Sequence, residues 1–199
     1  MGHKPKIGII VGTTRQGRFA DGPTNWIAAI AGKRIDAEFE VVDLRDYPMP
    51  FFEEKGSPFY VPPENEIALK WAAKMDSLDG YIFITAEYNH SVSGVLKNAL
   101  DYAYKEYNRK PATFVAYGGT GGARAVEHLR NILAELQVAS LKFPVHIGMN
   151  EMLGIMREGK TMADYPYLDE TAEKMLDELL WWTSALKTAR ESADIRAAA

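Results

Sequence analysis

Two threonines and two arginines follow the first apolar run of the chain, in the stretch KIGIIVGTTRQGR at residues 6–18. Gly12 allows a sharp turn after the run, and Thr13, Arg15 and Arg18 come after that turn. Hydroxyl groups, guanidinium groups and the free backbone N–H groups at the start of a helix all bind phosphate. The stretch therefore predicts an anion site, although a solvated connection between a strand and a helix has the same composition.

The glycine pattern of this stretch differs from the common nucleotide-binding loops. A Walker A loop ends in Gly-Lys-Ser or Gly-Lys-Thr, and neither triplet occurs between residues 6 and 18. A dinucleotide fingerprint needs three glycines at fixed spacing after the strand, whereas only Gly12 and Gly17 are present. The stretch therefore matches neither type of nucleotide loop, and its ligand would be another phosphate-bearing molecule that binds threonine and arginine.

Two further loops carry groups that could bind a flat ligand. In the first, Glu87, Tyr88 and Asn89 follow the apolar run GYIFIT, and a tyrosine beside an asparagine offers an apolar face and amide hydrogen bonds. The alternative is an asparagine-containing turn with a surface tyrosine. In the second, the glycine-rich sequence YGGTGGAR at 117–124 ends another apolar run.

The elements that must position these loops alternate along the chain. Five apolar runs predict strands, and the fifth, within 138–147, contains Pro144 and is expected at a sheet edge. Helices are expected between them. This pattern predicts an α/β fold, a flavodoxin-like doubly wound five-stranded parallel sheet of order 2-1-3-4-5 with helices on both faces. Ligands bind such sheets at the carboxyl ends of the strands, where the three loops would converge. The expected strands are 7–11, 39–44, 80–85, 112–119 and part of 138–147. The first expected helix begins near residue 24, and the other four cover 66–78, 92–107, 122–136 and 168–189.

Composition excludes several classes of function. The 199 residues fit one domain, 1–199, with a flexible tail from about residue 190. A net charge of −4 gives no argument for nucleic acid, and no apolar run approaches the roughly 20 residues of a membrane span. The chain has no cysteine, which rules out a thiolate metal site and a cysteine-based phosphatase. We expect a cytoplasmic protein without a metal site.

A long segment rich in proline and aromatic residues follows the second predicted strand, DLRDYPMPFFEEKGSPFYVPPEN at 43–65. An ordered surface loop is one interpretation. So many exposed aromatic side chains would form a sticky patch on a monomer, which favours the wall of a pocket or a subunit interface.

The segment EYNHSVSGVLKNALDYA, residues 87–103, resembles the flavin-ring loop and following helix of the NAD(P)H-dependent FMN reductase family. The stretch at residues 12–18 resembles that family's Gly-Ser-x-Arg phosphate loop. The sequence GGTGGARAVEHLR at 118–130 resembles the last of the family's three motifs. The three motifs occur in order between residues 6 and 147. The resemblance implies a flavodoxin-like fold, FMN at the carboxyl edge of the sheet, and a homodimer or homotetramer.

Carried over to this sequence, the family's motifs imply the cofactor-binding residues. Threonine stands at the position where serine is usual and keeps the hydroxyl, while Ala86 replaces a usual proline, which would leave the loop more mobile. Lys97, Asn98 and Asp101 are expected to hold the loop, and His90 to have a structural or solvent role. The implied FMN contacts are Thr13, Arg15 and Arg18 at the phosphate, Ala86 (main chain), Glu87, Tyr88 and Asn89 at the ring, and Gly118, Gly119 and Thr120 on the other flank.

The activity implied by the resemblance is an FMN-dependent NAD(P)H oxidoreductase that passes electrons through bound flavin to free flavin, a quinone or a similar small-molecule acceptor by a ping-pong mechanism. No catalytic side chain is implied, because the flavin carries the chemistry. Either NADPH or NADH fits as co-substrate. The alternative is a flavodoxin-type electron-transfer protein without NAD(P)H activity. The modest charge and the absence of a Thr-Gly-Asn-Thr pattern in the first loop count against that alternative.

Overall fold

A computed structural model describes residues 4–198 of the chain, with residues 194–198 described only as helical backbone. Its centre is a parallel sheet in which the strands pair in the order β2-β1-β3-β4-β5, and a sixth short strand also pairs with β4. The predicted order 2-1-3-4-5 is confirmed. The strands are β1 (Lys6–Val11), β2 (Glu38–Asp43), β3 (Gly80–Ala86), β4 (Pro111–Tyr117), β5 (Ala139–Ser140) and β6 (Val145–Ile147).

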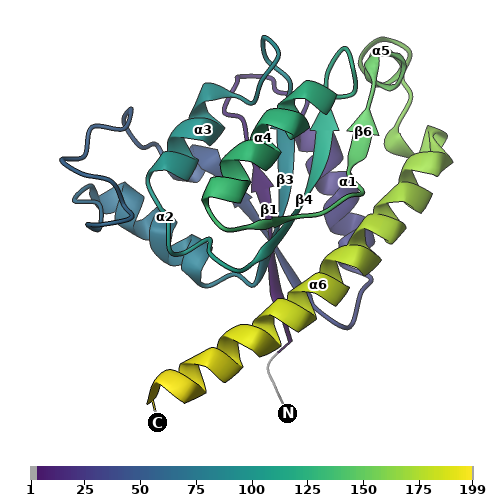
Figure 1. Ribbon diagram of the computed structural model, residues 1–199. Coiled ribbons are helices and arrows are strands. Elements are labelled where there is room, and N and C mark those ends of the chain that lie inside the picture. The colour runs from purple at the N-terminus through teal and green to yellow at the C-terminus, as the bar shows by residue number, and fades with distance from the viewer. Residues whose placement is uncertain (1–3, 199) are drawn as a thin grey trace.

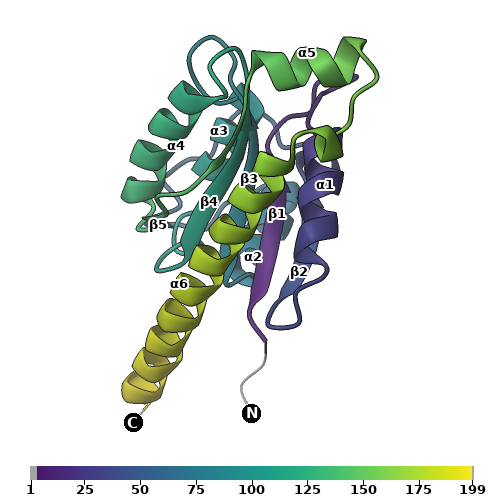
Figure 2. The same ribbon diagram turned by 90° about the vertical axis from the view of Figure 1, so that its right-hand side faces the viewer.

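Helices cover both faces of this sheet, as the unbroken apolar strands predict. Every residue of β3 and β4 is buried. Figures 1 and 2 show α2, α3 and α4 on one face of the sheet, and α1 and the long α6 on the other. The helices are α1 (Asp21–Ala31), α2 (Glu66–Asp76), α3 (Gly94–Asp101), α4 (Ala123–Glu135), α5 (Met149–Arg157) and α6 (Pro166–Ala198), with short 3₁₀ turns η1 (Leu44–Asp46) and η2 (Met162–Asp164).

Several boundaries differ from those predicted. The fifth strand divides into β5 and β6 on either side of Pro144, which has no N–H to donate to a sheet. Helix α3 ends six residues early, because Tyr102 and Tyr107 turn inward and the Tyr107 hydroxyl accepts from Trp71 Nε1 at 2.9 Å. Helix α5 was not predicted. The segment from about residue 190, expected to be a flexible tail, is helical to Ala198.

Three loops at the carboxyl edge of the sheet are the ones that the sequence singles out: loop 1 (residues 12–20), loop 3 (87–93) and loop 4 (118–122). Loop 1 begins at Gly12 because β3 and α3 approach it closely. A Cβ at Gly12 would lie 2.8 Å from the Ile84 carbonyl oxygen and 2.9 Å from Leu96 Cδ2. Ser93 caps α3 by accepting from Leu96 N at 3.2 Å, and its hydroxyl donates to the Gly12 carbonyl. Loops 1 and 3 are therefore joined at their bases.

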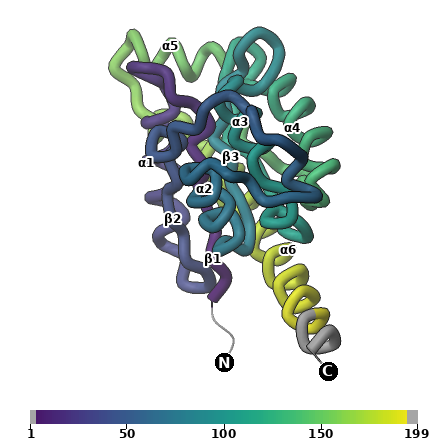
Figure 3. Tube along the Cα trace, turned by 90° about the vertical axis from the view of Figure 1, so that its left-hand side faces the viewer, coloured from purple at the N-terminus to yellow at the C-terminus, as the bar shows by residue number. Residues whose placement is uncertain are grey.

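A fourth segment, the aromatic loop (residues 47–65), connects η1 to α2 and crosses the layer formed by α2 and α3 (Figure 3). Asn98 of α3 holds it through both amide atoms, accepting from Phe52 N at 2.9 Å and donating to Pro50 O at 2.7 Å. Phe51 and Tyr60 nevertheless remain 85% and 81% exposed. The segment is therefore an ordered loop that presents aromatic side chains to solvent.

Both ends of the described chain lie away from these loops. β1 starts and α6 ends at the amino-terminal edge of the sheet, while the loops lie at the opposite edge (Figure 1). No helix within residues 4–198 combines the length and apolar character needed to cross a bilayer.

Candidate functional site

Arg18, a predicted phosphate contact, is bonded to other groups of the protein. Its side chain is 4% exposed. Nε donates to Asp21 Oδ1 at 2.7 Å, Nη1 donates to Asp43 Oδ1 at 2.7 Å and to the Thr13 carbonyl at 2.6 Å, and Nη2 donates to Asp43. The hydrogen bonds with Asp43 raise the pKa of Arg18 above its ordinary value, in spite of burial. Four of its five N–H groups are thus used to fold loop 1 against the end of β2.

Arg15 is the available cation of loop 1. It is exposed, and no carboxylate among residues 4–198 lies within ion-pair distance of it. Its backbone carbonyl accepts from Arg45 Nη2 at 2.8 Å. The other predicted side chain, Thr13, is buried, and its hydroxyl lies 3.2 Å from the Tyr88 hydroxyl of loop 3.

Tyr117, the last residue of β4, is a site residue that the sequence reasoning missed. Its hydroxyl is buried and has no hydrogen-bond partner in the described part of the chain. Burial raises its pKa, while the charges of Arg18 and Arg15 and the nearby backbone N–H of Ala20 act in the opposite direction. The Phe19 ring of loop 1 lies 5.1 Å away between ring centroids. A phosphate at the start of α1 would give this hydroxyl a partner, and Arg15 is free to offset its charge. These residues therefore fit the phosphate of FMN.

Loop 3 is a tight two-residue hairpin. Tyr88 and Ser91 exchange both backbone hydrogen bonds, at 2.9 and 3.1 Å. Asn89 and His90 between them have φ angles of 49° and 75°, as a type I′ turn requires. Asparagine and histidine are among the non-glycine residues that adopt positive φ angles most often. Asn89 is exposed at the tip, where a ligand can reach it.

Glu87 and Thr120 join loop 3 to loop 4. The Glu87 side chain is 3% exposed and accepts from Arg124 Nε at 2.7 Å, from Arg124 N at 3.1 Å and from the Thr120 hydroxyl at 3.0 Å. Burial alone would raise the pKa of Glu87, but the bonds with Arg124 and Thr120 hold it below its ordinary value. These two side chains are engaged with each other and with Arg124, so they hold loops 3 and 4 together.

The backbone positions at the base of loops 3 and 4 are fixed by the sheet. Ala86 is buried and pairs with Tyr117, and Glu87 N donates to Tyr117 O at 2.9 Å. In loop 4, Gly122 has φ 73°, and a Cβ there would lie 2.7 Å from Ala116 Cβ. Gly118 is buried, while Gly119 and Thr120 are exposed at the edge. The structure thus brings together the predicted residues of all three loops.

Four residues were expected to play supporting roles, namely Lys97, Asn98 and Asp101 in holding the loop and His90 in a structural or solvent role. Asn98 holds a loop, although it is the aromatic loop rather than loop 3. Lys97 and Asp101 pair with each other at 2.6 Å. The His90 and His128 rings lie 5.7 Å apart at the surface, and His128 Nδ1 lies 2.9 Å from Ser91 Oγ. The Ser91 hydroxyl and His128 are within the distance of a nucleophile and its base, but no third group among residues 4–198 is hydrogen-bonded to the His128 ring to orient it.

One stretch elsewhere in the chain, GIMREGKT at 154–161, has the residue spacing of a Walker A loop. That motif requires a strand before it and a helix after it. Here Gly154 lies inside α5, Lys160 Nζ pairs with Glu158 at 2.8 Å, and Thr161 precedes the short turn η2. The context differs from that of a phosphate loop, so this match marks only the turn between α5 and α6.

Comparison with known proteins identifies the family to which the chain belongs. Residues 5–148 match the model of the family described as NADPH-dependent FMN reductase. The chain is 33% identical over 139 residues to an NAD(P)H-dependent FMN reductase of Schizosaccharomyces pombe, covering 67% of this chain and 68% of that one. It is 31% identical over 146 residues to a 2-hydroxy-1,4-benzoquinone reductase of a Burkholderia species, covering 70% and 75%. The solved structure of FerB, a flavoenzyme NAD(P)H:(acceptor) oxidoreductase of Paracoccus denitrificans, superposes with a TM-score of 0.70 at 20% identity over 91% of this chain and 98% of that chain.

Proposed function

Because the chain belongs to the NADPH-dependent FMN reductase family, we propose that it oxidises NADPH or NADH through bound FMN and reduces a small acceptor such as a quinone or free flavin. The observation that carries this proposal is a pair of groups beside loop 1, the exposed Arg15 side chain and the buried Tyr117 hydroxyl, for which the described part of the chain provides no ion-pair or side-chain hydrogen-bond partner. They lie in one site with the loops that resemble the family's ring-binding loops.

Different residues of this chain bind the phosphate and the ring of FMN. Arg15 and Tyr117 contact the phosphate, and Arg18 keeps loop 1 in the conformation that presents them. The main chain of loop 3 and the edge formed by Gly119 of loop 4 contact the ring, with Glu87 holding the two loops together. When bound, FMN supplies the redox chemistry, because it takes two electrons from a nicotinamide and gives them to an acceptor.

The first experiment is to purify the protein, record its visible spectrum and assay NADPH and NADH oxidation with a quinone. The proposed function requires flavin absorbance, or saturable FMN binding, together with turnover. A protein that binds FMN but is reduced only slowly by both nicotinamides would be the electron-carrier alternative. A protein that binds no FMN would contradict both.

We expect a ping-pong kinetic pattern. NADPH and a flat acceptor are expected to use the same opening, between the Asn89 turn and the aromatic loop, and two flat molecules cannot occupy it together. With a quinone varied at several fixed NADPH concentrations, double-reciprocal plots should be parallel, and high quinone should inhibit competitively against NADPH. Intersecting lines with a detectable NADPH–enzyme–quinone complex would contradict a shared opening.

We propose that the protein forms a homodimer or homotetramer. In this assembly the aromatic loop helps to enclose the site of a neighbouring subunit. The basis is the exposure of Phe51 and Tyr60 on an ordered loop that leads to the site. We expect light scattering at micromolar concentration to give a multiple of the chain mass of 22.2 kDa, and the double variant Phe51→Ser/Tyr60→Ser to shift it toward a monomer.

The matched control for that variant is Ile35→Ser, since Ile35 is an exposed apolar residue (84%) remote from the aromatic loop. It should leave the mass unchanged. A wild-type protein that stays at 22.2 kDa would remove the aromatic loop from any subunit interface.

A further inference from the structure

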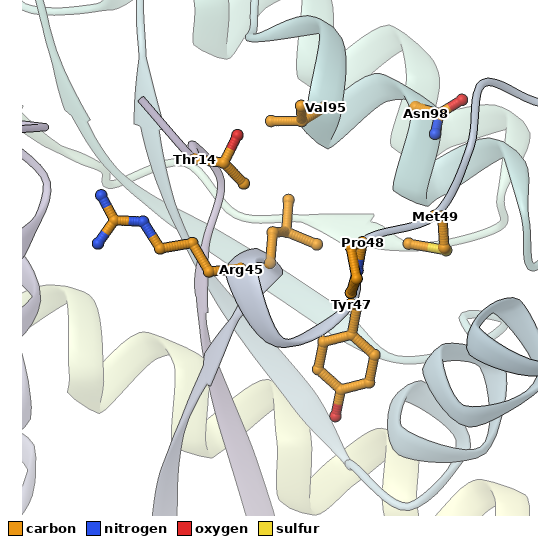
Figure 4. A pocket seen from close by; sticks show the side chains of 8 residues that line it. Thr14, Arg45, Tyr47, Pro48, Met49, Val95 and Asn98 are labelled. Atoms are coloured by element: carbon orange, nitrogen blue, oxygen red, sulfur yellow. The ribbon is translucent and has the colours of Figure 1, made fainter. Parts of the chain in front are cut away.

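A pocket of about 270 Å³ lies beside loop 1, between η1 and the beginning of α3 (Figure 4). It is separate from the groups assigned to FMN, although Thr14 of loop 1 forms part of its wall. Its lining combines apolar side chains with polar ones, Thr14 and Arg45 on one side and Asn98 on the other (Figure 4). The lining residues are Thr14, Leu44, Arg45, Tyr47, Pro48, Met49, Val95 and Asn98.

Arg45 stands at the rim of this pocket, and its side chain extends away from the other lining residues (Figure 4). Its Nη2 donates to the Arg15 carbonyl at 2.8 Å, which brings it beside the phosphate loop. The nearby Asp43 directs its carboxylate to Arg18 and to the Arg45 backbone N–H. Within residues 4–198, no carboxylate forms an ion pair with the Arg45 guanidinium. It is therefore a cation available to a ligand.

The walls of the pocket are held in place before any ligand binds. Asn98 uses both amide atoms to fix the aromatic loop at Pro50 and Phe52. The Tyr47 ring packs edge-on against the buried Trp71, with ring centroids 5.2 Å apart. A site with fixed walls loses less conformational entropy on binding, which favours a specific ligand over an incidental one.

The size and chemistry of the pocket restrict what it can hold. Small-molecule sites are usually roughly 300–1,000 Å³ and mostly apolar with a few polar groups. At about 270 Å³ this pocket lies slightly below that range, so it suits one base with its sugar rather than a complete dinucleotide. Leu44, Pro48, Met49 and Val95 offer apolar surface to a flat base, and Arg45 at the rim suits a phosphate attached to the sugar.

The proposed function supplies a ligand of this kind. NADPH differs from NADH only in a phosphate on the 2′-oxygen of its adenosine, and a nearby arginine is the usual group that accepts that phosphate in other dinucleotide sites. We propose that this pocket binds the adenosine end of NADPH, with Arg45 at the 2′-phosphate, so that the enzyme prefers NADPH to NADH. The inference rests on the proposed function and deepens it.

The test uses the FMN-loaded wild type and the Arg45→Ala variant, assayed with both nicotinamides and one quinone. We expect the ratio of kcat/KM for NADPH to kcat/KM for NADH to fall by about ten- to a hundredfold, the effect of one charge-assisted contact. Adenosine 2′,5′-bisphosphate is a probe that needs no turnover. By calorimetry it should bind the wild type, compete with NADPH but not with FMN, and bind Arg45→Ala more weakly by a similar factor.

Two further variants separate the pocket from a general effect of charge. Lys174→Ala removes one exposed positive charge from α6 and should leave the ratio unchanged. Val95→Phe narrows the pocket without changing charge and should weaken binding of the bisphosphate. If Arg45→Ala is active and its ratio of kcat/KM for NADPH to kcat/KM for NADH equals that of the wild type, this inference is overturned while the proposed function stays intact. Weaker FMN binding in Arg45→Ala, a changed quinone KM alone, or a changed oligomeric mass would also overturn it, assigning the pocket instead to FMN, to the acceptor or to a subunit interface.

Discussion

Replacing Arg18 with methionine should lower the free energy of unfolding by about 3 kcal/mol, as expected when one partner of a buried ion pair is removed. The variant leaves Asp43, which is 23% exposed, without its counter-charge, and it removes the donor to the Thr13 carbonyl. Urea unfolding of the FMN-free protein at pH 7 measures this effect. The exposed neighbour Arg15 provides the control, because Arg15→Met should change the stability by less than about 0.5 kcal/mol.

The pH dependence of the Arg18 effect has a definite sign. Burial raises the pKa of Asp43, but hydrogen bonds from Arg18 and from the Arg45 N–H hold it below its ordinary value. The ionised Asp43 therefore stabilises the fold above its unfolded pKa of about 4, and this contribution is lost as the pH falls through the lower, folded pKa. The difference between wild type and Arg18→Met should shrink on acidification below about pH 4.

A double variant distinguishes the structural role of Arg18 from a phosphate contact. In Arg18→Met/Asp43→Leu neither charge is left alone, so much of the lost stability should return. If Arg18→Met keeps the wild-type stability and loses only FMN affinity, then Arg18 contacts the phosphate, as the family resemblance implies.

Replacing Arg15 with alanine should raise the dissociation constant of FMN by about one to two decades and leave the fold intact. Arg15 is exposed, so its side chain contributes little to folding, and a charge-assisted hydrogen bond is worth about 1.5–3 kcal/mol. Titration of the FMN-free protein with FMN, followed by flavin fluorescence, measures the change.

Arg15→Lys is the matched variant for this experiment. It keeps the charge but loses the planar donor pair, so it should bind FMN with an affinity between wild type and Arg15→Ala. Tyr117→Phe removes only the unpartnered hydroxyl and should weaken FMN binding without lowering stability. An unchanged dissociation constant in Arg15→Ala would remove Arg15 from the site.

The sheet could be predicted because its central strands are almost continuous apolar runs. Such runs in β1, β3 and β4 are buried on both faces, and the right-handed crossover rule leaves few orders for strands that alternate with helices. The ends of α3 and of the fifth strand were harder. Tyr102 and Tyr107 look helical by spacing, and only tertiary packing shows that they turn inward.

The candidate site was predictable in its loops but less so in its side-chain partners. The sequence shows that Glu87 and Arg18 follow strands. Their partners lie far away along the chain, Arg124 in the first turn of α4 and Asp43 at the end of β2. Tyr117 was missed because a tyrosine in an apolar strand is indistinguishable by sequence from a core residue. Its one unsatisfied oxygen becomes visible only when the hydrogen bonds around it are known.

The opposite placement of the chain ends and the site has a practical consequence for anchoring the enzyme. β1 starts and α6 ends at the amino-terminal edge of the sheet, while loops 1, 3 and 4 lie at the other edge (Figure 1). A surface linker, an electrode tether or a nicotinamide-regenerating enzyme fused at either end of the described chain would therefore point away from loops 1, 3 and 4, where we propose that FMN and the substrates bind. The immobilised protein would keep its redox face turned toward the solution.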